Sequence, residues 1–170
     1  MEVVIARNNV IIKATRLPII DANVSQMGQL FQNVISNSIK FRKPGVNPII
    51  EISVEEINGS RLLSEHKLNN HAFSISQNGN NLEKEKFCKI KFSDNGIGFD
   101  HAYASRIFEV FQRLHSKDEY EGTGIGLAIC KRIVDIHHGI INTESEPGEG
   151  ATFIILLPYS QENFREDFKI

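Results

Sequence analysis

The sequence predicts one α/β domain, a two-layer sandwich in which a mixed, largely antiparallel sheet packs on about three helices. Two observations support this class. The segments follow in the order strands, helix, strand, strand, short helix, helix and hairpin, which cannot place helices on both faces of a parallel sheet. The length of 170 residues, with 41% hydrophobic and 24% charged residues, is typical of one globular domain with a buried core. We assign residues 1–158 to this domain and residues 159–170 to a charged tail.

The first segments are predicted to form a hairpin, an extended piece, a helix and a strand. Apolar runs on either side of a polar turn indicate a hairpin over Val3–Ile12, and a proline favours an extended piece at Leu17–Ile20. Asn23 can cap a helix over Val24–Phe41, where apolar residues recur with helical period, so one face belongs to the core. Beyond a turn rich in proline and glycine, alternation of apolar and polar residues predicts a strand over Ile49–Ile57.

The middle of the chain, residues 58–85, is rich in asparagine and serine and has little apolar periodicity. We therefore predict a long, mobile connection between two antiparallel strands, the second of which resumes at Phe87–Phe92. His66 and His71 lie in this connection, but a metal site would need further ligands, so solvated loop residues are favoured.

Two helices are predicted after this second strand. Asp100 can cap a short helix that ends near Ile107. The polar stretch Gln112–Glu121 is interpreted as a flexible lid. A strongly amphipathic helix follows over Ile125–His138, closed by Gly139 at a C-cap position.

The last segments are predicted to form a hairpin and a frayed end. Strands over Ile140–Glu146 and Ala151–Leu157 flank a turn that contains one proline and two glycines. The charged stretch Gln161–Ile170 has few apolar residues and is expected to fray.

Composition excludes several classes of function. The net charge of -2 argues against a nucleic-acid partner. No run approaches the roughly 18 apolar residues that a membrane span requires, and the amino terminus lacks a signal-peptide pattern. The two cysteines, Cys88 and Cys130, have no paired spacing and are expected to be packed thiols of a cytoplasmic protein.

Asp94 opens the first of two glycine-rich turns, Asp94–Gly98. A buried carboxylate only accepts hydrogen bonds, so it suits the exocyclic amino group of adenine and finds no donor in the keto oxygen of guanine. The mismatch would cost roughly 1–3 kcal/mol, so Asp94 is a candidate for selecting adenine. An ordinary Asp-Asn-Gly turn explains the same residues equally well.

Asn33, Asn37 and Lys40 fall on one face of the first predicted helix, at positions i, i+4 and i+7. Amide oxygens are hard ligands for Mg²⁺, and a lysine attracts phosphate as a point charge. The stripe taken alone is more simply a solvated helix face.

The second glycine-rich turn, Gly122–Leu127, opens the amphipathic helix. Its GxGxG spacing differs from the dinucleotide fingerprint, and no Gly-Lys-Ser/Thr follows as in a phosphate loop. We interpret it as a lid hinge whose amides, with Thr123, close on phosphate groups at a helix start.

Five blocks in this order resemble the catalytic and ATP-binding domain of sensor histidine kinases, whose Bergerat-type fold is shared with gyrase, heat-shock chaperone and mismatch-repair ATPases. The blocks resemble that family's N box, G1 box, F box, G2 box and terminal glycine block, and lie at residues 29–41, 94–98, 107–111, 122–127 and 148–153.

The resemblance implies that Asp94 binds the adenine amino group, with help from Thr152 through ordered water. It also implies that Asn37 and Asn33 hold Mg²⁺ and that Lys40 contacts phosphate, which makes Asn33 and Lys40 the catalytic candidates. The other implied nucleotide contacts are Gly96, Gly98, Phe108, Phe111, Arg113, Gly122, Thr123, Gly124, Ile125, Gly126 and Leu127.

The family uses ATP and magnesium to phosphorylate a histidine on a dimerising helical hairpin, which then passes the phosphoryl group to a response regulator in bacterial two-component signalling. None of the six histidines has the acceptor's sequence context. We therefore expect the catalytic portion of a larger kinase, a monomer in the cytoplasm without membrane contact, that binds Mg-ATP but does not phosphorylate itself.

Two rival functions remain at this stage. An ATP hydrolase of the same fold would need a glutamate base where this chain has Asn33. A degenerate kinase would use the site only to sense nucleotide, although all five blocks are intact. Ser38 stands where alanine is common in the family, and residues 58–85 exceed the usual connection.

Overall fold

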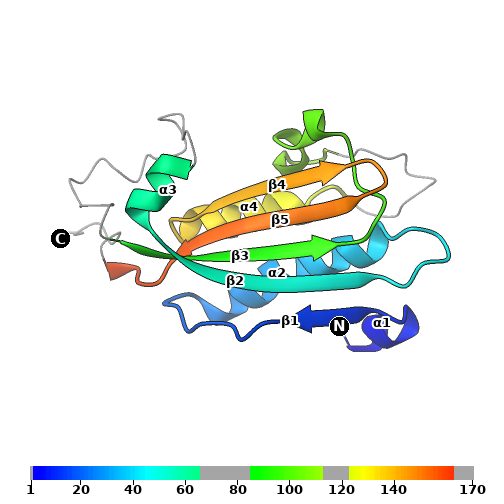
Figure 1. Cartoon of the computed structure of the whole chain (residues 1–170), viewed down its shortest axis with the longest axis horizontal. Helices are drawn as coiled ribbons and strands as arrows, with labels where there is room; N and C mark the ends of the chain where they lie inside the picture. Colours follow the sequence, from blue (N-terminus) through cyan, green and yellow to red (C-terminus); the bar gives the residue numbers. More distant parts are fainter. Residues whose placement is uncertain (1, 66–84, 113–122, 163–170) are drawn as a thin grey trace.

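The computed structural model describes residues 2–65, 85–112 and 123–162. Its centre is a five-stranded sheet of order β1-β2-β3-β5-β4 (Figure 1). The strands are β1 (Ile11–Ala14), β2 (Ile49–Asn58), β3 (Lys86–Asp94), β4 (Ile140–Glu146) and β5 (Gly150–Pro158). Only the β1–β2 pair is parallel among these strands, so the prediction of a mixed, largely antiparallel sheet is confirmed.

The main core lies between the sheet and the two longer helices, α2 (Val24–Lys40) and α4 (Gly126–Ile136), which Figure 1 shows on one face of the sheet. Alternate residues of the central strands point toward these helices and are buried, as Phe92 and Ile155 are. The rings of Phe31 from α2 and Phe92 from β3 pack edge to face, with a centroid distance of 4.9 Å. Side-chain alternation therefore fixes which face of the sheet the helices cover.

A smaller apolar cluster occupies one end of the opposite face. Helix α3 (Gly59–Glu65) places Leu62 there against Phe87 and Leu156, whose strand neighbours point into the main core. The predicted loop over 58–85 is therefore wrong at its start, because one apolar residue is enough to anchor a short helix on the sheet. Residues 66–84 lie outside the described part of the chain, as do the two histidines within them.

Helix α2 begins and ends as its sequence predicts. The Asn23 side-chain oxygen accepts a hydrogen bond from the backbone N–H of Gln26, which satisfies one free donor at the helix start. Phe41 forms the C-cap, and its N–H donates to the carbonyl of Asn37.

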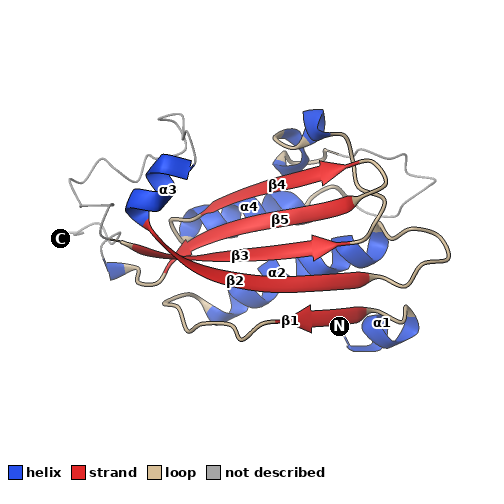
Figure 2. Ribbon diagram, viewed as in Figure 1, coloured by secondary structure: helices blue, strands red, loops and turns tan. Residues whose placement is uncertain are grey.

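The predicted hairpin over Val3–Ile12 is wrong. The chain instead forms helix α1 (Glu2–Arg7), followed by β1 at the sheet edge (Figure 2). Asn9 adopts a left-handed φ of 50°, and the Val10 N–H donates to the carbonyl of Ile5, so the polar residues end a helix. β1 therefore pairs with β2, which is distant in the sequence, and not with the residues just before it.

The segment after β3 holds two 3₁₀ turns, η3 (His101–Tyr103) and η4 (Arg106–Phe108), where one short helix was predicted. The Asp100 carboxylate caps the first by accepting from the Ala102 N–H at 2.8 Å, as expected. The predicted lid lies outside the described residues except for its first residue, Gln112.

The prediction that Gly139 occupies the C-cap position of α4 is wrong. His137 is the C-cap residue, and His138 after it adopts the left-handed conformation, with a φ of 54°. Gly139 is needed for another reason, because a Cβ there would overlap with the carbonyl oxygen of Leu156. The β4–β5 hairpin that follows is confirmed, and residues 163–170 of the tail lie outside the described part.

Candidate functional site

Asp94 ends β3 with its carboxylate half-buried and held by three donors. Oδ1 accepts from the backbone N–H groups of Gly96 at 2.9 Å and Ala151 at 3.2 Å. Oδ2 accepts from the Ser38 hydroxyl at 2.8 Å. Burial raises the pKa of Asp94 above its ordinary value, and the three hydrogen bonds oppose that rise. The result is a fixed acceptor at the carboxyl end of a central strand.

The two glycines of the first turn are required by the protein's own backbone. A Cβ on Gly96 would lie 2.6 Å from the carbonyl oxygen of Phe41 at the end of α2. Gly98 has a φ of 62°, and a Cβ there would overlap with the carbonyl oxygen of Glu146. The Ile97 N–H also donates to the Phe41 carbonyl at 2.9 Å. The turn is therefore clamped between α2 and the β4–β5 hairpin, which fixes the position of Asp94.

Two side chains that the sequence did not identify as important complete this clamp. Asn95 accepts from the Ile49 N–H at 2.9 Å and donates to the Asn47 carbonyl at 3.1 Å, which ties the turn to the start of β2. Ser145 accepts from the Phe99 N–H and donates to a carbonyl in β5. Their partners are more than 40 residues distant, or across a hairpin, so local sequence carries no signal for either role.

On the α2 face, Asn33 is brought to the start of α4. Its Nδ2 donates to the carbonyl of Gly126 at 3.2 Å, which joins the N-box helix to the second glycine turn. Asn37 is half-buried one turn further along the same helix. The Lys40 ammonium lies 4.5 Å from the centre of the Phe41 ring, beside the clamped turn. The predicted stripe therefore runs from the start of α4 to the Asp94 end.

The start of α4 has an open geometry. The N-cap residue Ile125 makes no side-chain capping bond, so the first amide groups of the helix receive no such acceptor. Gly124 has a φ of 71°, and its carbonyl accepts from the N–H of Phe111, itself at a φ of 64° with 72% of its surface exposed. Phe108 packs against the core and anchors this segment.

The remaining predicted residues fall in three groups. Thr123 is exposed, and Leu127 packs against the core. Arg113 and Gly122 lie outside the described residues. The hydroxyl of Thr152 donates to Ser93 at 3.0 Å on the sheet face opposite the helices. The terminal glycine block, residues 148–153, instead contacts Asp94 through the backbone N–H of Ala151. The role of Thr152 in binding adenine therefore stays a prediction.

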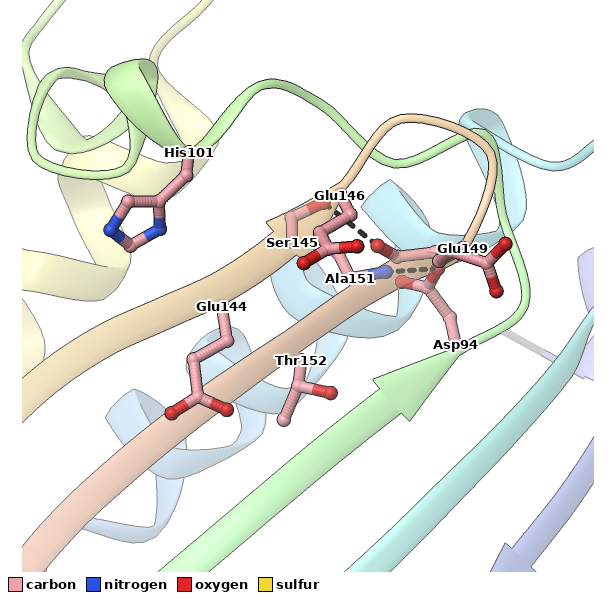
Figure 3. Close-up of a pocket in the computed structure, with 9 residues that line it drawn as sticks. Asp94, His101, Glu144, Ser145, Glu146, Glu149, Ala151 and Thr152 are labelled. Carbon is pink, nitrogen blue, oxygen red and sulfur yellow. Dashed lines mark hydrogen bonds between the residues drawn. The ribbon is translucent and has the colours of Figure 1, made fainter.

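A cavity of about 440 Å³ adjoins Asp94 along the β4–β5 hairpin (Figure 3). Its lining residues are Asp94, His101, Glu144, Ser145, Glu146, Glu149, Gly150, Ala151 and Thr152. Four of them are carboxylic acids, so the cavity disfavours a polyanion. Within the described residues no group of three or more His, Cys, Asp or Glu side chains has the arrangement of a metal site.

A family model described as "Histidine kinase-, DNA gyrase B-, and HSP90-like ATPase" matches residues 22–161. Among curated proteins, cyanobacterial phytochrome A of Nostoc sp. is 43% identical over 142 residues, which is 84% of this chain and 15% of that protein. The phytochrome-like protein Cph1 of Synechocystis sp. is 40% identical over 147 residues, 86% of this chain and 16% of that protein. The chain thus spans about a sixth of these relatives.

Solved structures share the fold. The mycobacterial sensor histidine kinase MprB has a TM-score of 0.66 at 21% identity, covering 92% of this chain and 87% of that one. Full-length ShkA, solved in complex with AMPPNP, has a TM-score of 0.65 at 22% identity, covering 94% of this chain and 27% of that one. Among the helices described for this chain, none has the length and apolar character to cross a membrane.

Proposed function

The chain belongs to the family of histidine kinase-, DNA gyrase B- and HSP90-like ATPases, and from this premise we propose that it binds Mg-ATP as the catalytic domain of a histidine kinase. In this proposal the domain presents the γ-phosphate to a histidine on dimerisation helices outside this sequence. A response regulator then receives the phosphoryl group, and the reaction takes place in the cytoplasm.

The half-buried carboxylate of Asp94, fixed by three hydrogen bonds, is the observation that carries the proposal. Its three donors leave about one of its four lone-pair positions, on Oδ2, for a further donor. The exocyclic amino group of adenine supplies one, whereas guanine places a keto oxygen at the same edge. Because the clamped turn fixes the carboxylate before any ligand arrives, little ordering cost remains for the base to meet.

The phosphates are proposed to extend from Asp94 toward the start of α4. The glutamates of the hairpin cavity would repel them in the other direction. Toward α4 they meet the Lys40 ammonium and the uncapped amides that follow Ile125, a favourable site for an anion. This path also brings them past Asn33 and Asn37.

The amide oxygens of Asn33 and Asn37 suit Mg²⁺. Because Nδ2 of Asn33 donates to the Gly126 carbonyl, the orientation of its carboxamide is fixed, and Oδ1 is the atom offered to a cation. Bound Mg²⁺ would neutralise phosphate charge, which is the main requirement of phosphoryl transfer. A carboxamide cannot act as the general base that hydrolysis needs, so Asn33 favours transfer over steady ATP hydrolysis.

Calorimetric titration with a non-hydrolysable ATP analogue and Mg²⁺ tests the proposal. We expect binding to the unaltered protein, loss of binding in Asp94→Asn, and no comparable binding of the guanine analogue. Asp100→Asn is the matched control, because that exposed carboxylate caps η3 and an asparagine can cap it equally well. Failure of the unaltered protein to bind the adenine analogue would refute the proposal.

A further inference from the structure

Ser38 is a buried polar residue that the roles assigned so far do not use. It lies on the inner side of α2 with 3% of its surface exposed. Its hydroxyl is 2.8 Å from Oδ2 of Asp94, in a residue 56 positions along the chain, and 3.3 Å from the carbonyl oxygen of Val34. The hydroxyl has a single hydrogen, and it is donated to the Asp94 carboxylate, because that acceptor is closer and charged.

We propose that Ser38 helps Asp94 to recognise adenine: its hydroxyl holds Oδ2 as a hydrogen-bond acceptor, which extends the pH range over which the site accepts adenine and rejects guanine. The inference rests on the proposed function, since it concerns the base that the same site binds. Ser38 acts through Asp94 and is therefore a positioning residue.

The hydrogen-bond geometry supports this role. Both backbone donors, Gly96 and Ala151, bond to Oδ1, so Ser38 is the one described donor to Oδ2. Without the hydroxyl, the half-buried Oδ2 would have no donor among the described residues until a ligand arrives. A protonated Oδ2 could then donate to the keto oxygen of guanine, and it would oppose the amino group of adenine.

The charge balance points the same way. Burial raises the pKa of Asp94 and Ser38 supplies one of the three bonds that lower it, so removing the hydroxyl raises the pKa further. Adenine needs the ionised carboxylate, whose population is lost as pH falls through this pKa. The loss therefore occurs at higher pH when Ser38 is replaced.

Other ionisable groups face the same cavity without altering this comparison. They are His101 from η3, Glu144 and Glu146 from β4, and Glu149 from the hairpin turn. Lys40 is the ionisable residue of α2, and its ammonium lies over the Phe41 ring. All are present in both proteins, so the difference between the two pH profiles isolates the hydroxyl.

The test is calorimetric titration with ADP and with GDP across a pH series, for the unaltered protein and Ser38→Ala. We expect the midpoint of the ADP profile to move up by about one pH unit or more, and the preference for ADP over GDP to fall about tenfold at the pH where the profiles diverge. Ser36→Ala is the matched control, since Ser36 is exposed on the same helix. It should change neither quantity.

A second measurement does not depend on nucleotide binding. The carboxyl carbon of Asp94 is titrated by NMR in both unliganded proteins, and its midpoint should be higher in Ser38→Ala. Equal midpoints together with an unchanged ADP to GDP ratio would overturn the inference and leave the proposed function intact. A protein that binds neither nucleotide would refute the proposed function and the base-selection role together, even if the NMR midpoints differ.

Discussion

The two ends of the candidate site differ in how fully the protein builds them. At the Asp94 end, three donors hold the carboxylate, and backbone contacts leave no room for a Cβ on Gly96 or Gly98. At the α4 end, the helix start has no side-chain cap, and the neighbouring Phe111 is largely exposed with a left-handed φ. In the proposed function the Asp94 end binds the base and the α4 end binds the phosphates, and we call them the base end and the phosphate end. We therefore expect the base end to be formed before binding and the phosphate end to be completed by the ligand.

The strongest way to break the base end is Gly98→Ala. A Cβ would overlap with the Glu146 carbonyl oxygen, and the left-handed φ adds strain, so we expect a loss of stability above about 3 kcal/mol, or no folded protein. Urea denaturation measures it. Gly148→Ala separates the two causes, because Gly148 also has a left-handed φ of 86° but open space around its Cβ position. It should cost only about 1–2 kcal/mol; equal losses would contradict the packing argument.

At the end of α2 far from Lys40, we expect a substitution to lower stability without changing nucleotide affinity. Buried His137 accepts from the Asn23 N–H through Nε2 at 3.1 Å, so its hydrogen is on Nδ1, which donates to the Ile133 carbonyl at 2.8 Å. His137→Phe leaves that N–H without its acceptor and should cost about 1–3 kcal/mol in urea denaturation.

The affinity for the ATP analogue should be unchanged in His137→Phe, because the contact lies at the opposite end of the helix from Lys40. His138→Phe is unsuitable as a control, since that residue needs a left-handed φ, so Ile136→Phe serves as the exposed comparison. A large change in affinity would show that the two ends of α2 are coupled.

The phosphate end is tested by Asn33→Ala. Loss of the amide removes a proposed Mg²⁺ ligand and the bond to the Gly126 carbonyl, so the magnesium-dependent gain in ATP-analogue affinity should fall at least about tenfold. Affinity for ADP without magnesium should change little, since the base end is intact. Gln32→Ala, at an exposed neighbouring position, is the control. Equal loss with and without magnesium would argue against a metal role.

The smallest expected effect concerns Thr143 in β4. Its hydroxyl is buried and makes no hydrogen bond within the described part of the chain. Thr143→Val has the same shape and removes this unpaired group, so stability should rise by up to about 1 kcal/mol in urea denaturation. A loss of stability would show that the hydroxyl has a partner, such as an ordered water.

Periodicity and local capping were enough to predict most of the fold. The helix that Asn23 caps and the strands over 49–57 and 140–157 follow from patterns within a few residues. The hairpin predicted at Val3–Ile12 failed because β1 pairs with β2, nearly forty residues away, and a helix ends where the turn was expected. Pairing at that separation depends on tertiary packing, which local pattern does not contain.

The candidate site was predictable as a set of ordered blocks, and less so as contacts. Asp94, Asn33 and Lys40 were identified from chemistry and spacing. The Ser38 hydrogen bond to Asp94 joins residues far apart in the chain. The residues around a helical serine do not indicate such a distant partner. Asn95 and Ser145 were missed for the same reason, since each acts through backbone groups of another element.

Hydrogen exchange of backbone amides, with and without the ATP analogue and Mg²⁺, tests the contrast between the two ends most directly. The Gly96 and Ala151 amides, which bond to Asp94, should be protected before nucleotide is added and change little afterwards. The Gly126 and Leu127 amides at the start of α4 should exchange fast alone and gain protection on binding. Fast exchange at Gly96 and Ala151 in the free protein, or no gain at α4, would contradict the account.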